Sequence, residues 1–297
     1  MRADRRLAYA LIAPAVIVLL AILAYPLGRL LVLSFQKFDS RSLFTGEAPF
    51  VGLGNYAKVL ADGAFWLVLG RTALITATTV VAVMVGGFLL AQLLRKTSGW
   101  ARMTLMIGLV LVWGMPMVSA AIIWQWLFQP QYGVMNWVLT RLGVFGDLSA
   151  HNWFGNATEA LAIIIVMVAW KGLPFVAITL YAAMTQIPEE LYEAASLDGA
   201  GPGRIASAIT LPMLRPILVV LTTLQVIWSV NSFTPFWVLT QGGPAGGTTT
   251  LSIYAFVRAL TANDYGTGAA ISIITVILLS VLSAAYVRRL AAQGELA

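Results

Sequence analysis

A set of polar side chains interrupts the apolar stretch 216–240 at the spacing of one helix face. They stand at i, i+3, i+4 and i+7, with an amide at the edge: Gln225, Trp228, Ser229, Ser232 and Asn231. Sugars are bound through hydrogen bonds to amides and hydroxyls and by stacking on aromatic rings. The stripe therefore has the chemistry of a carbohydrate-binding surface. Hydrogen bonding between neighbouring helices is the alternative interpretation.

A lysine at the centre of another apolar stretch, 159–184, is the second candidate. A charge at the middle of a membrane is costly, so Lys171 is expected to face a polar cavity or a partner rather than lipid. Gly172 and Pro174 would open the helix wall beside it, and Phe175 would share its face. The ammonium could meet an anionic group of a solute or a carboxylate of another subunit. No aspartate or glutamate lies in the interior of an apolar stretch, so none is available there as an internal partner.

Other chemistry is excluded by residue types that the chain lacks. It has no cysteine and one histidine, His151, so neither a thiolate metal site nor a histidine cluster can form. No carboxylate pattern accompanies His151, so we expect it to carry neither a ligand nor a proton. The sequence has no Gly-Lys-Ser phosphate loop, no nucleophile elbow and no paired catalytic carboxylates. We therefore expect no enzyme activity and no cofactor on this chain.

The elements that position the candidate residues are predicted to be membrane helices. Hydrophobic residues make up 60% of the 297 residues and charged residues 10%, which indicates an integral membrane protein. The apolar stretches long enough to cross a bilayer as helices are 8–34, 66–94, 103–128, 159–184, 216–240 and 267–288. The first continues past Tyr25 and Pro26 without a cleavage site, so it is expected to remain as a membrane helix. The predicted fold is all-α, with six transmembrane helices in a single domain, 1–297.

Lysine and arginine residues in the connections predict the orientation. They are most frequent on one side of the membrane: Arg2, Arg5, Arg6, Arg95, Lys96, Arg102, Arg204, Arg215, Arg288 and Arg289. Both termini and the connection 185–215 are therefore expected to be cytoplasmic, in a multi-pass protein of the plasma or inner membrane. Because the net charge of +6 comes from residues at the ends of apolar blocks, nucleic acid is not expected as a partner.

The connection 185–215 has the pattern of two short helices joined by a bend. Pro188 and the acidic residues after it favour a helix start, because proline fits the first turn and acids suit the positive end of the helix dipole. The glycines in 199–203 break this helix, and 204–213 can form a second one. Such an exposed elbow suits docking into a groove of another protein.

The spacing within this connection resembles the cytoplasmic coupling motif of binding-protein-dependent ABC importer permeases. That motif reads Glu-Ala-Ala, three residues, Gly, nine residues, Ile, one residue, Leu-Pro. The matching positions are Glu193, Ala194, Ala195, Gly199, Ile209, Leu211 and Pro212. Asp198 and Ala200 complete the Asp-Gly-Ala variant of sugar-type permeases.

Two external segments extend the resemblance to sugar permeases. Gly52-Leu53-Gly54-Asn55-Tyr56 resembles the Gly-Leu-x-Asn-Tyr stretch that follows their first helix, and an interfacial amphipathic helix is the alternative. The segment 239–244 is similar to their Leu-Thr-x-Gly-Gly-Pro loop. The resemblance implies that an extended loop here contacts a binding protein through Gln241, Gly242, Gly243 and Pro244. A simple tight turn is the alternative.

The resemblance implies a permease subunit of a type I ABC importer of the maltose-type sugar family. It implies a second homologous permease, two ATP-binding cassette subunits that carry ATP and Mg, and an extracytoplasmic solute-binding protein or lipoprotein. The substrate path at mid-membrane is then expected at Lys171, Gly172 and Phe175, together with the polar stripe on 216–240. The solute, an oligosaccharide, amino sugar or glycerol phosphate derivative, stays open. The alternative class, an ion-driven secondary transporter, would need buried carboxylates or sodium sites.

Overall fold

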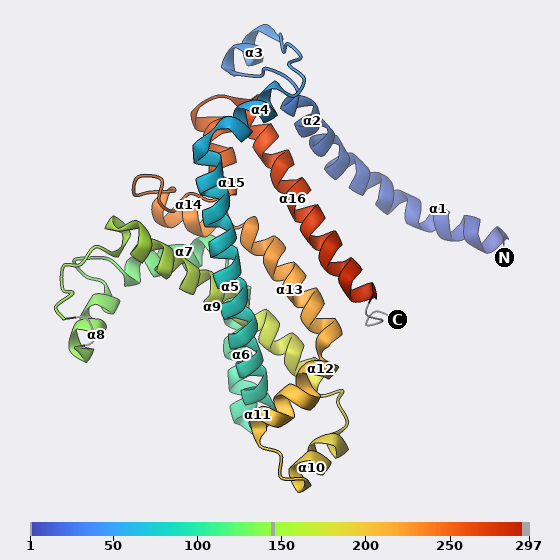
Figure 1. Cartoon of the computed structure of the whole chain (residues 1–297), viewed down its shortest axis with the longest axis vertical. Coiled ribbons are helices and arrows are strands. Elements are labelled where there is room, and N and C mark those ends of the chain that lie inside the picture. The colour runs from blue at the N-terminus through green and yellow to red at the C-terminus, as the bar shows by residue number, and fades with distance from the viewer. Residues whose placement is uncertain (1, 144–145, 293–297) are drawn as a thin grey trace. The chain divides into compact units, whose positions relative to one another are not determined.

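The computed structural model describes residues 2–143 and 146–292, and the described residues form helices joined by turns and loops (Figure 1). They group into two compact units. Unit 1 contains residues 2–67 and 254–278, and unit 2 contains residues 68–253 and 279–292. The expected single domain 1–297 stays a prediction, and its residues 1, 144–145 and 293–297 lie outside the described part.

The long apolar helices confirm the predicted all-α membrane fold. The segments long enough to cross a bilayer are Leu11–Ser34, Gly63–Lys96, Ala157–Met184, Arg215–Thr240 and Tyr265–Ala285. A sixth span is formed if the bent pair Gly99–Gly114 and Met117–Leu127 counts as one. The predicted boundaries therefore lie close to the observed ones, except within the third and fifth stretches.

The third stretch, expected as one helix over 103–128, is two helices at an angle of 101°. Helix α6 (Gly99–Gly114) ends before Met115, which is extended at φ −65° and ψ 132°, and α7 (Met117–Leu127) begins after Pro116. Proline disfavours a helical conformation in the residue before it and has no N–H to continue the hydrogen-bond ladder. The sequence Gly114-Met115-Pro116 therefore breaks the helix rather than only bending it.

Unit 1 combines the first helices of the chain with a segment close to its last helix. Its elements are α1 (Arg2–Leu19), a π-helical turn (Leu20–Ala24), α2 (Tyr25–Ser34), α3 (Ser40–Thr45), α4 (Gly54–Ala61), a second π-helical turn (Val257–Thr261) and the first half of α16 (Tyr265–Ala292). Asn55 is buried, and its Nδ2 donates to the carbonyls of Ser34 and Gln36, both at 2.9 Å. The Asn-Tyr stretch thus fixes the end of the first span to α4.

Two ion pairs close unit 1 at the same end. Lys58 pairs with Asp264, and Arg258 pairs with Asp62 at 2.6 Å. The hydroxyl of Tyr254 also donates to Asp62, and this hydrogen bond is the main reason that the pKa of Asp62 lies below its usual value. Asp62 is therefore ionised at neutral pH and keeps its partner there.

Unit 2 is organised around α9 (Ala157–Met184), which runs through Pro174 without interruption. It packs beside α5 (Gly63–Lys96), α6, α13 (Arg215–Val230) and α14 (Thr234–Thr240). The fifth stretch, expected as one helix over 216–240, is interrupted between α13 and α14. The core includes Val83, Val176, Leu180 and Leu221.

The approach of α5 to α9 depends on glycines. A Cβ atom at Gly87 would lie 2.5 Å from Val176 Cγ1 and 3.4 Å from the backbone nitrogen of Ala177. At Gly86 a Cβ would meet the end of Leu173, which can move. Gly87 is therefore the position where the two helices cannot accept a side chain without separating.

We expect Gly87→Ala to destabilise the protein by about 1 to 3 kcal/mol, because overpacking forces the helices apart. Gly70→Ala is the matched control, since Gly70 lies on the same helix and nothing is within 4 Å of its added Cβ. Both substitutions replace glycine by alanine in the same helix and so gain the same helix propensity. The difference in stability between the two variants therefore measures the cost of overpacking at Gly87. Thermal unfolding of the purified complex in detergent measures it, and equal melting temperatures for the two variants would contradict the expectation.

Candidate functional site

A pocket of about 310 Å³ lies where five helices of unit 2 meet. Helix α5 contributes Thr79, and the break between α6 and α7 contributes Trp113 and Met117. The remaining lining residues come from α9 and from α13 with the turn after it: Val168, Lys171, Gly172, Phe175, Gln225, Trp228, Ser229 and Ser232. Residues far apart in the sequence therefore form one concave surface.

Most residues expected in the substrate path meet in this pocket. Lys171, Gly172 and Phe175 line it together with the polar stripe. Asn231 is not among its lining residues, and its side-chain amide donates back to the carbonyl of Ile227 at 2.9 Å. Sequence reasoning missed Thr79, Trp113, Met117 and Val168. The Gly-Met-Pro break was a signal for two of these, since a broken helix exposes the residues that flank it.

Three aromatic rings form one wall of the pocket. Trp113 stacks on Phe175 with centroids 6.1 Å apart and planes at 20°. Phe175 in turn meets the ring of Trp228 edge-on at 5.2 Å and 62°. Trp228 remains 46% exposed, so one face of its ring is free to contact another flat surface.

The same pocket is also lined by buried polar groups without partners among the described residues. Among the described residues, Thr79 Oγ1, Gln225 Nε2 and Ser229 Oγ are buried and have no hydrogen-bond partner within the chain. The exposed fractions of these residues are 2%, 5% and 6%. An unpaired buried polar group costs about 1 to 3 kcal/mol, so three of them around one pocket indicate a surface shaped for hydrogen-bonding ligands.

Lys171 has internal partners that the sequence did not reveal. Its Nζ donates to the backbone carbonyls of Val112 at 3.1 Å and Trp113 at 2.6 Å. Backbone carbonyls at a helix end therefore bind the ammonium in place of the carboxylate that the apolar stretches lack. The side chain still lines the pocket.

The connection 185–215 forms the expected elbow. It consists of α10 (Glu189–Leu197), α11 (Pro202–Ile205), a π-helical turn (Ala206–Thr210) and α12 (Leu211–Met213). Gly199 follows α10 in the left-handed conformation, at φ +76°. Its N–H donates a hydrogen bond to the carbonyl of Ser196, and the N–H of Ala200 donates one to the carbonyl of Ala195. This C-terminal cap is why the motif needs glycine here.

A buried tyrosine fastens the elbow to the helices of unit 2. Tyr192 is 4% exposed and lies in the core with Leu180, Ile187 and Leu214. The Arg95 guanidinium at the end of α5 stacks 3.6 Å from the centroid of its ring, and its hydroxyl lies 3.4 Å from Thr210 Oγ1. These contacts anchor the elbow to the end of α5 and to the core cluster.

The opposite side of the elbow carries most of the motif. Ala195, Ala200 and Ile209 are half-buried, and the other motif positions are exposed: Glu193, Ala194, Asp198, Gly199, Leu211 and Pro212. Leu197 is also 90% exposed. An acidic residue beside small and apolar side chains is therefore open for contact.

The segment 239–250 is compact rather than extended. Thr248 Oγ1 donates to the carbonyl of Gly243 at 2.8 Å, and Thr249 Oγ1 donates to that of Gly242 at 3.2 Å. Arg71 of α5 donates to the carbonyl of Gly246 at 2.7 Å. Gly242 is buried, whereas Gln241 is exposed. The tight-turn interpretation describes this shape better than the extended loop.

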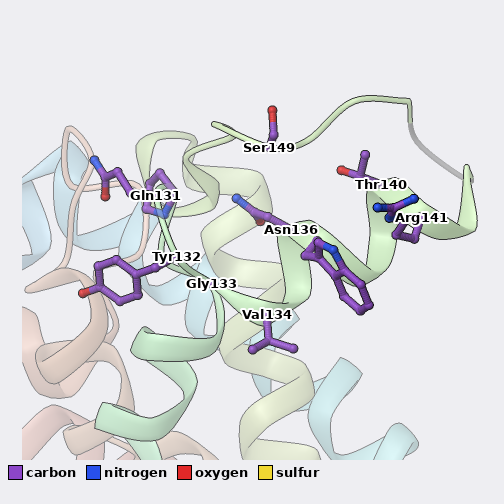
Figure 2. A pocket seen from close by; sticks show the side chains of 10 residues that line it. Gln131, Tyr132, Gly133, Val134, Asn136, Thr140, Arg141 and Ser149 are labelled. Carbon is purple, nitrogen blue, oxygen red and sulfur yellow. The ribbon is translucent and has the colours of Figure 1, made fainter.

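A second, larger pocket of about 450 Å³ lies around α8 (Val134–Leu142). Figure 2 shows that its side chains diverge, with Gln131 and Tyr132 on one side and Thr140 and Arg141 on the other. Its one buried amide, Asn136, is already bonded to the carbonyl of His151 and the indole N–H of Trp153. This pocket therefore lacks converging groups for a ligand.

His151 has a carboxylate partner that the sequence analysis did not find. Its Nε2 lies 2.8 Å from Glu159 Oε2 at the start of α9, and its ring meets Trp153 edge-on at 4.7 Å. The partner was missed because the two residues are eight positions apart and belong to different elements. The contact fixes the loop before α9.

Comparison with solved structures defines the class of this fold. A bacterial ABC transporter involved in the import of the acidic polysaccharide alginate contains a chain that superposes with a TM-score of 0.82 at 22% identity, covering 97% of this chain and 96% of that one. The protein is therefore an all-helical membrane protein with an ABC importer permease fold.

Comparison of sequences identifies the family. Residues 82–293 match the family model described as binding-protein-dependent transport system inner membrane component, and the chain belongs to this family. The diacetylchitobiose uptake system permease protein of Streptomyces coelicolor is 41% identical over 99% of this chain and 89% of its own length. The sulfoquinovosyl glycerol transport system permease protein of Agrobacterium fabrum is 37% identical over 96% of this chain and 90% of its own. The chain is thus a transporter permease component.

We expect Ser229→Ala to leave stability unchanged or slightly raised, because it removes a buried hydroxyl that has no partner among the described residues. Thr72→Val is the contrasting variant. The buried Thr72 hydroxyl donates to the carbonyl of Val68 and accepts from the N–H of Leu251, so its loss should cost about 1 to 3 kcal/mol. Thermal unfolding of the complex in detergent compares them. A large loss for Ser229→Ala would mean that its hydroxyl has a structural partner.

Proposed function

We propose that this chain is the permease subunit that carries a carbohydrate across the membrane, forming the path together with a second homologous permease. The observation that carries the proposal is the pocket at Lys171. Three buried polar groups that have no partner among the described residues line it together with a cluster of aromatic rings. Hydrogen-bonding groups and flat apolar rings in one pocket match the two chemically different parts of a sugar ring.

The names of the relatives support the same class of solute. One imports diacetylchitobiose and another sulfoquinovosyl glycerol, so both carry glycosides. The pocket volume of about 310 Å³ suits one or two sugar rings at a time, by comparison with the usual size of ligand pockets. We take a small neutral or weakly charged saccharide as the solute.

The direct test uses the complex reconstituted in liposomes with its solute-binding protein. Diacetylchitobiose, sulfoquinovosyl glycerol and a panel of other disaccharides are compared with amino acids as stimulators of ATP hydrolysis and uptake. Stimulation by at least one saccharide and by no amino acid is the expected result. Stimulation by amino acids alone would refute the carbohydrate proposal.

We also propose that the elbow 185–215 couples the chain to ATPase subunits that hold ATP and Mg, with both termini and the elbow in the cytoplasm. The exposed motif residues Glu193, Ala194, Asp198 and Leu211 support a docking role, since they face away from the anchor at Tyr192. The external turn containing Gln241, Gly242, Gly243 and Pro244 is proposed as a contact for the solute-binding protein. Its rigid threonine-bonded backbone would present Gln241 in one fixed conformation.

If Trp228 stacks on the solute, Trp228→Ala should raise the KM for uptake while ATPase docking stays intact. Loss of one aromatic contact is expected to cost about 1 to 3 kcal/mol, which is roughly fivefold to a hundredfold in affinity. Trp100→Ala is the matched control, because Trp100 is 81% exposed and lies outside the pocket. If the membrane abundance of the Trp228 variant falls in proportion to its uptake, the residue serves packing instead.

The cap at Gly199 offers a separate test of coupling. Gly199→Val forces a β-branched side chain into φ +76°, whereas asparagine tolerates this conformation. Nothing lies within 4 Å of an added Cβ, so steric overlap does not confuse the comparison. We expect the valine variant to lose most ATPase co-purification and uptake at normal abundance, and the asparagine variant to keep most of both. Normal uptake in the valine variant would show that the cap does not matter for coupling.

A further inference from the structure

We propose that Lys171 is a positioning residue that caps the broken end of α6 and thereby holds Trp113 in the pocket wall. Its positive charge is directed to the helix end rather than to the solute, so the pocket is built for neutral sugar rings. The solute class in this statement rests on the proposed function. The structural role of Lys171 does not.

The geometry explains why α6 needs an external donor. In a continuous helix the carbonyl of Val112 would accept from the N–H of residue 116, but Pro116 has no N–H, and this carbonyl instead accepts a longer hydrogen bond from the N–H of Met115 at 3.3 Å. The carbonyl of Trp113 would accept from Met117, but Met117 begins α7, whose axis turns away by 101°. These are the two carbonyls to which Lys171 Nζ donates, at 3.1 and 2.6 Å. The lysine replaces the donors that the break removes.

The same residue of α6 is held a second time by α9. The backbone of Trp113 accepts from Lys171, and its ring stacks on Phe175, four residues further along α9 and on the same face. The ring position therefore depends on where the carbonyl is fixed. Loss of the cap would free the end of α6 and move the aromatic wall.

The electrostatics point away from an anionic ligand. The C-terminal end of a helix carries a partial negative charge, which a lysine at 2.6 Å offsets. The other polar groups that line the pocket are the amide or hydroxyl groups of Thr79, Gln225, Ser229 and Ser232 and the indole N–H groups of Trp113 and Trp228, all of them uncharged. Most hydrogen-bonding groups offered to a solute are therefore uncharged.

Three substitutions separate this role from the alternatives. Lys171→Arg keeps charge and donors, Lys171→Gln keeps N–H donors without charge, and Lys171→Met keeps neither. If Lys171 positions α6, arginine and glutamine should preserve function in large part and methionine should not. If Lys171 binds an anionic solute, glutamine should fail together with methionine. If it pairs with a carboxylate of a second permease, both uncharged variants should weaken the association of the two permeases.

A readout that needs no solute is available because the chain has no cysteine. Met117→Cys places one thiol at the pocket beside the break, and its rate of alkylation by N-ethylmaleimide in the assembled complex reports on the packing of α6 against α9. We expect this rate to rise severalfold with Lys171→Met and to stay near the parent rate with Lys171→Gln. This result can hold even if the carbohydrate proposal fails.

Uptake kinetics with diacetylchitobiose, a neutral disaccharide, and sulfoquinovosyl glycerol, an anionic glycoside, give the second readout. Lys171→Met should raise the KM for whichever glycoside the complex carries by about tenfold, the usual scale for losing hydrogen bonds from a charged group. In the Lys171→Gln variant the KM for the same glycoside should stay within a few-fold of the parent value.

Three results would overturn the proposal. One is an unchanged alkylation rate in Lys171→Met. Another is a loss confined to sulfoquinovosyl glycerol in both the Met and the Gln variants. The third is a complex that dissociates during purification with both variants.

Discussion

A broken helix inside a membrane must have its backbone polar groups satisfied, and this constraint shapes the centre of unit 2. Hydrocarbon offers no hydrogen bonds, so a carbonyl released by a helix break requires a partner from the protein. Pro116 creates such a break at the end of α6, and Lys171 supplies the donors. The free-energy cost of placing the Lys171 ammonium in a membrane helix and the cost of leaving the carbonyls at the end of α6 without donors are thus both reduced by the same contact.

The pocket around Lys171 depends on how closely the neighbouring helices pack against α9. Gly87 lets α5 reach the backbone of α9, and Gly172 leaves room for Val83 and Gln225, which would lie 3.1 and 3.4 Å from an added Cβ. Because these helices are so close, Thr79 Oγ1 and Gln225 Nε2 are removed from water without gaining a hydrogen-bond partner among the described residues. The unsatisfied groups are a consequence of tight packing around a surface that the chain itself does not fill.

The sequence could predict the parts of the pocket that depend on local helix geometry. The spacing of Gln225, Trp228 and Ser229 is sufficient to place them on one face of α13, because helical periodicity needs no knowledge of the neighbours. Asn231 was predicted at the edge of this face, but it does not line the pocket, and its side-chain amide is bonded to the carbonyl of Ile227. The partners of Lys171 could not be found, because they are backbone atoms 58 and 59 residues away, and residue types say nothing about free carbonyls.

The shape of the segment 239–250 was also beyond what local sequence could predict. Glycines at 242 and 243 permit an extended loop as well as a compact turn, and the threonine hydroxyls that follow decide for the turn. Gly199 is a different case, since a helix followed by glycine at this spacing specifies a cap through local hydrogen bonds alone. Prediction was therefore reliable where neighbours in sequence determine the structure and failed where distant segments do.

The elbow and the pocket are built on the same two helices. Helix α5 carries Arg95, which stacks on Tyr192 of the elbow, and also Thr79 in the pocket, about 24 Å away at 1.5 Å per residue. Helix α9 ends at Met184, in the core cluster that includes Tyr192, and lines the pocket at Lys171. A densely packed core resists local deformation, so a displacement at Tyr192 has to be shared by these helices. The two sites proposed for coupling and for solute are thus mechanically connected by continuous helices, with no loop between them that could absorb the movement.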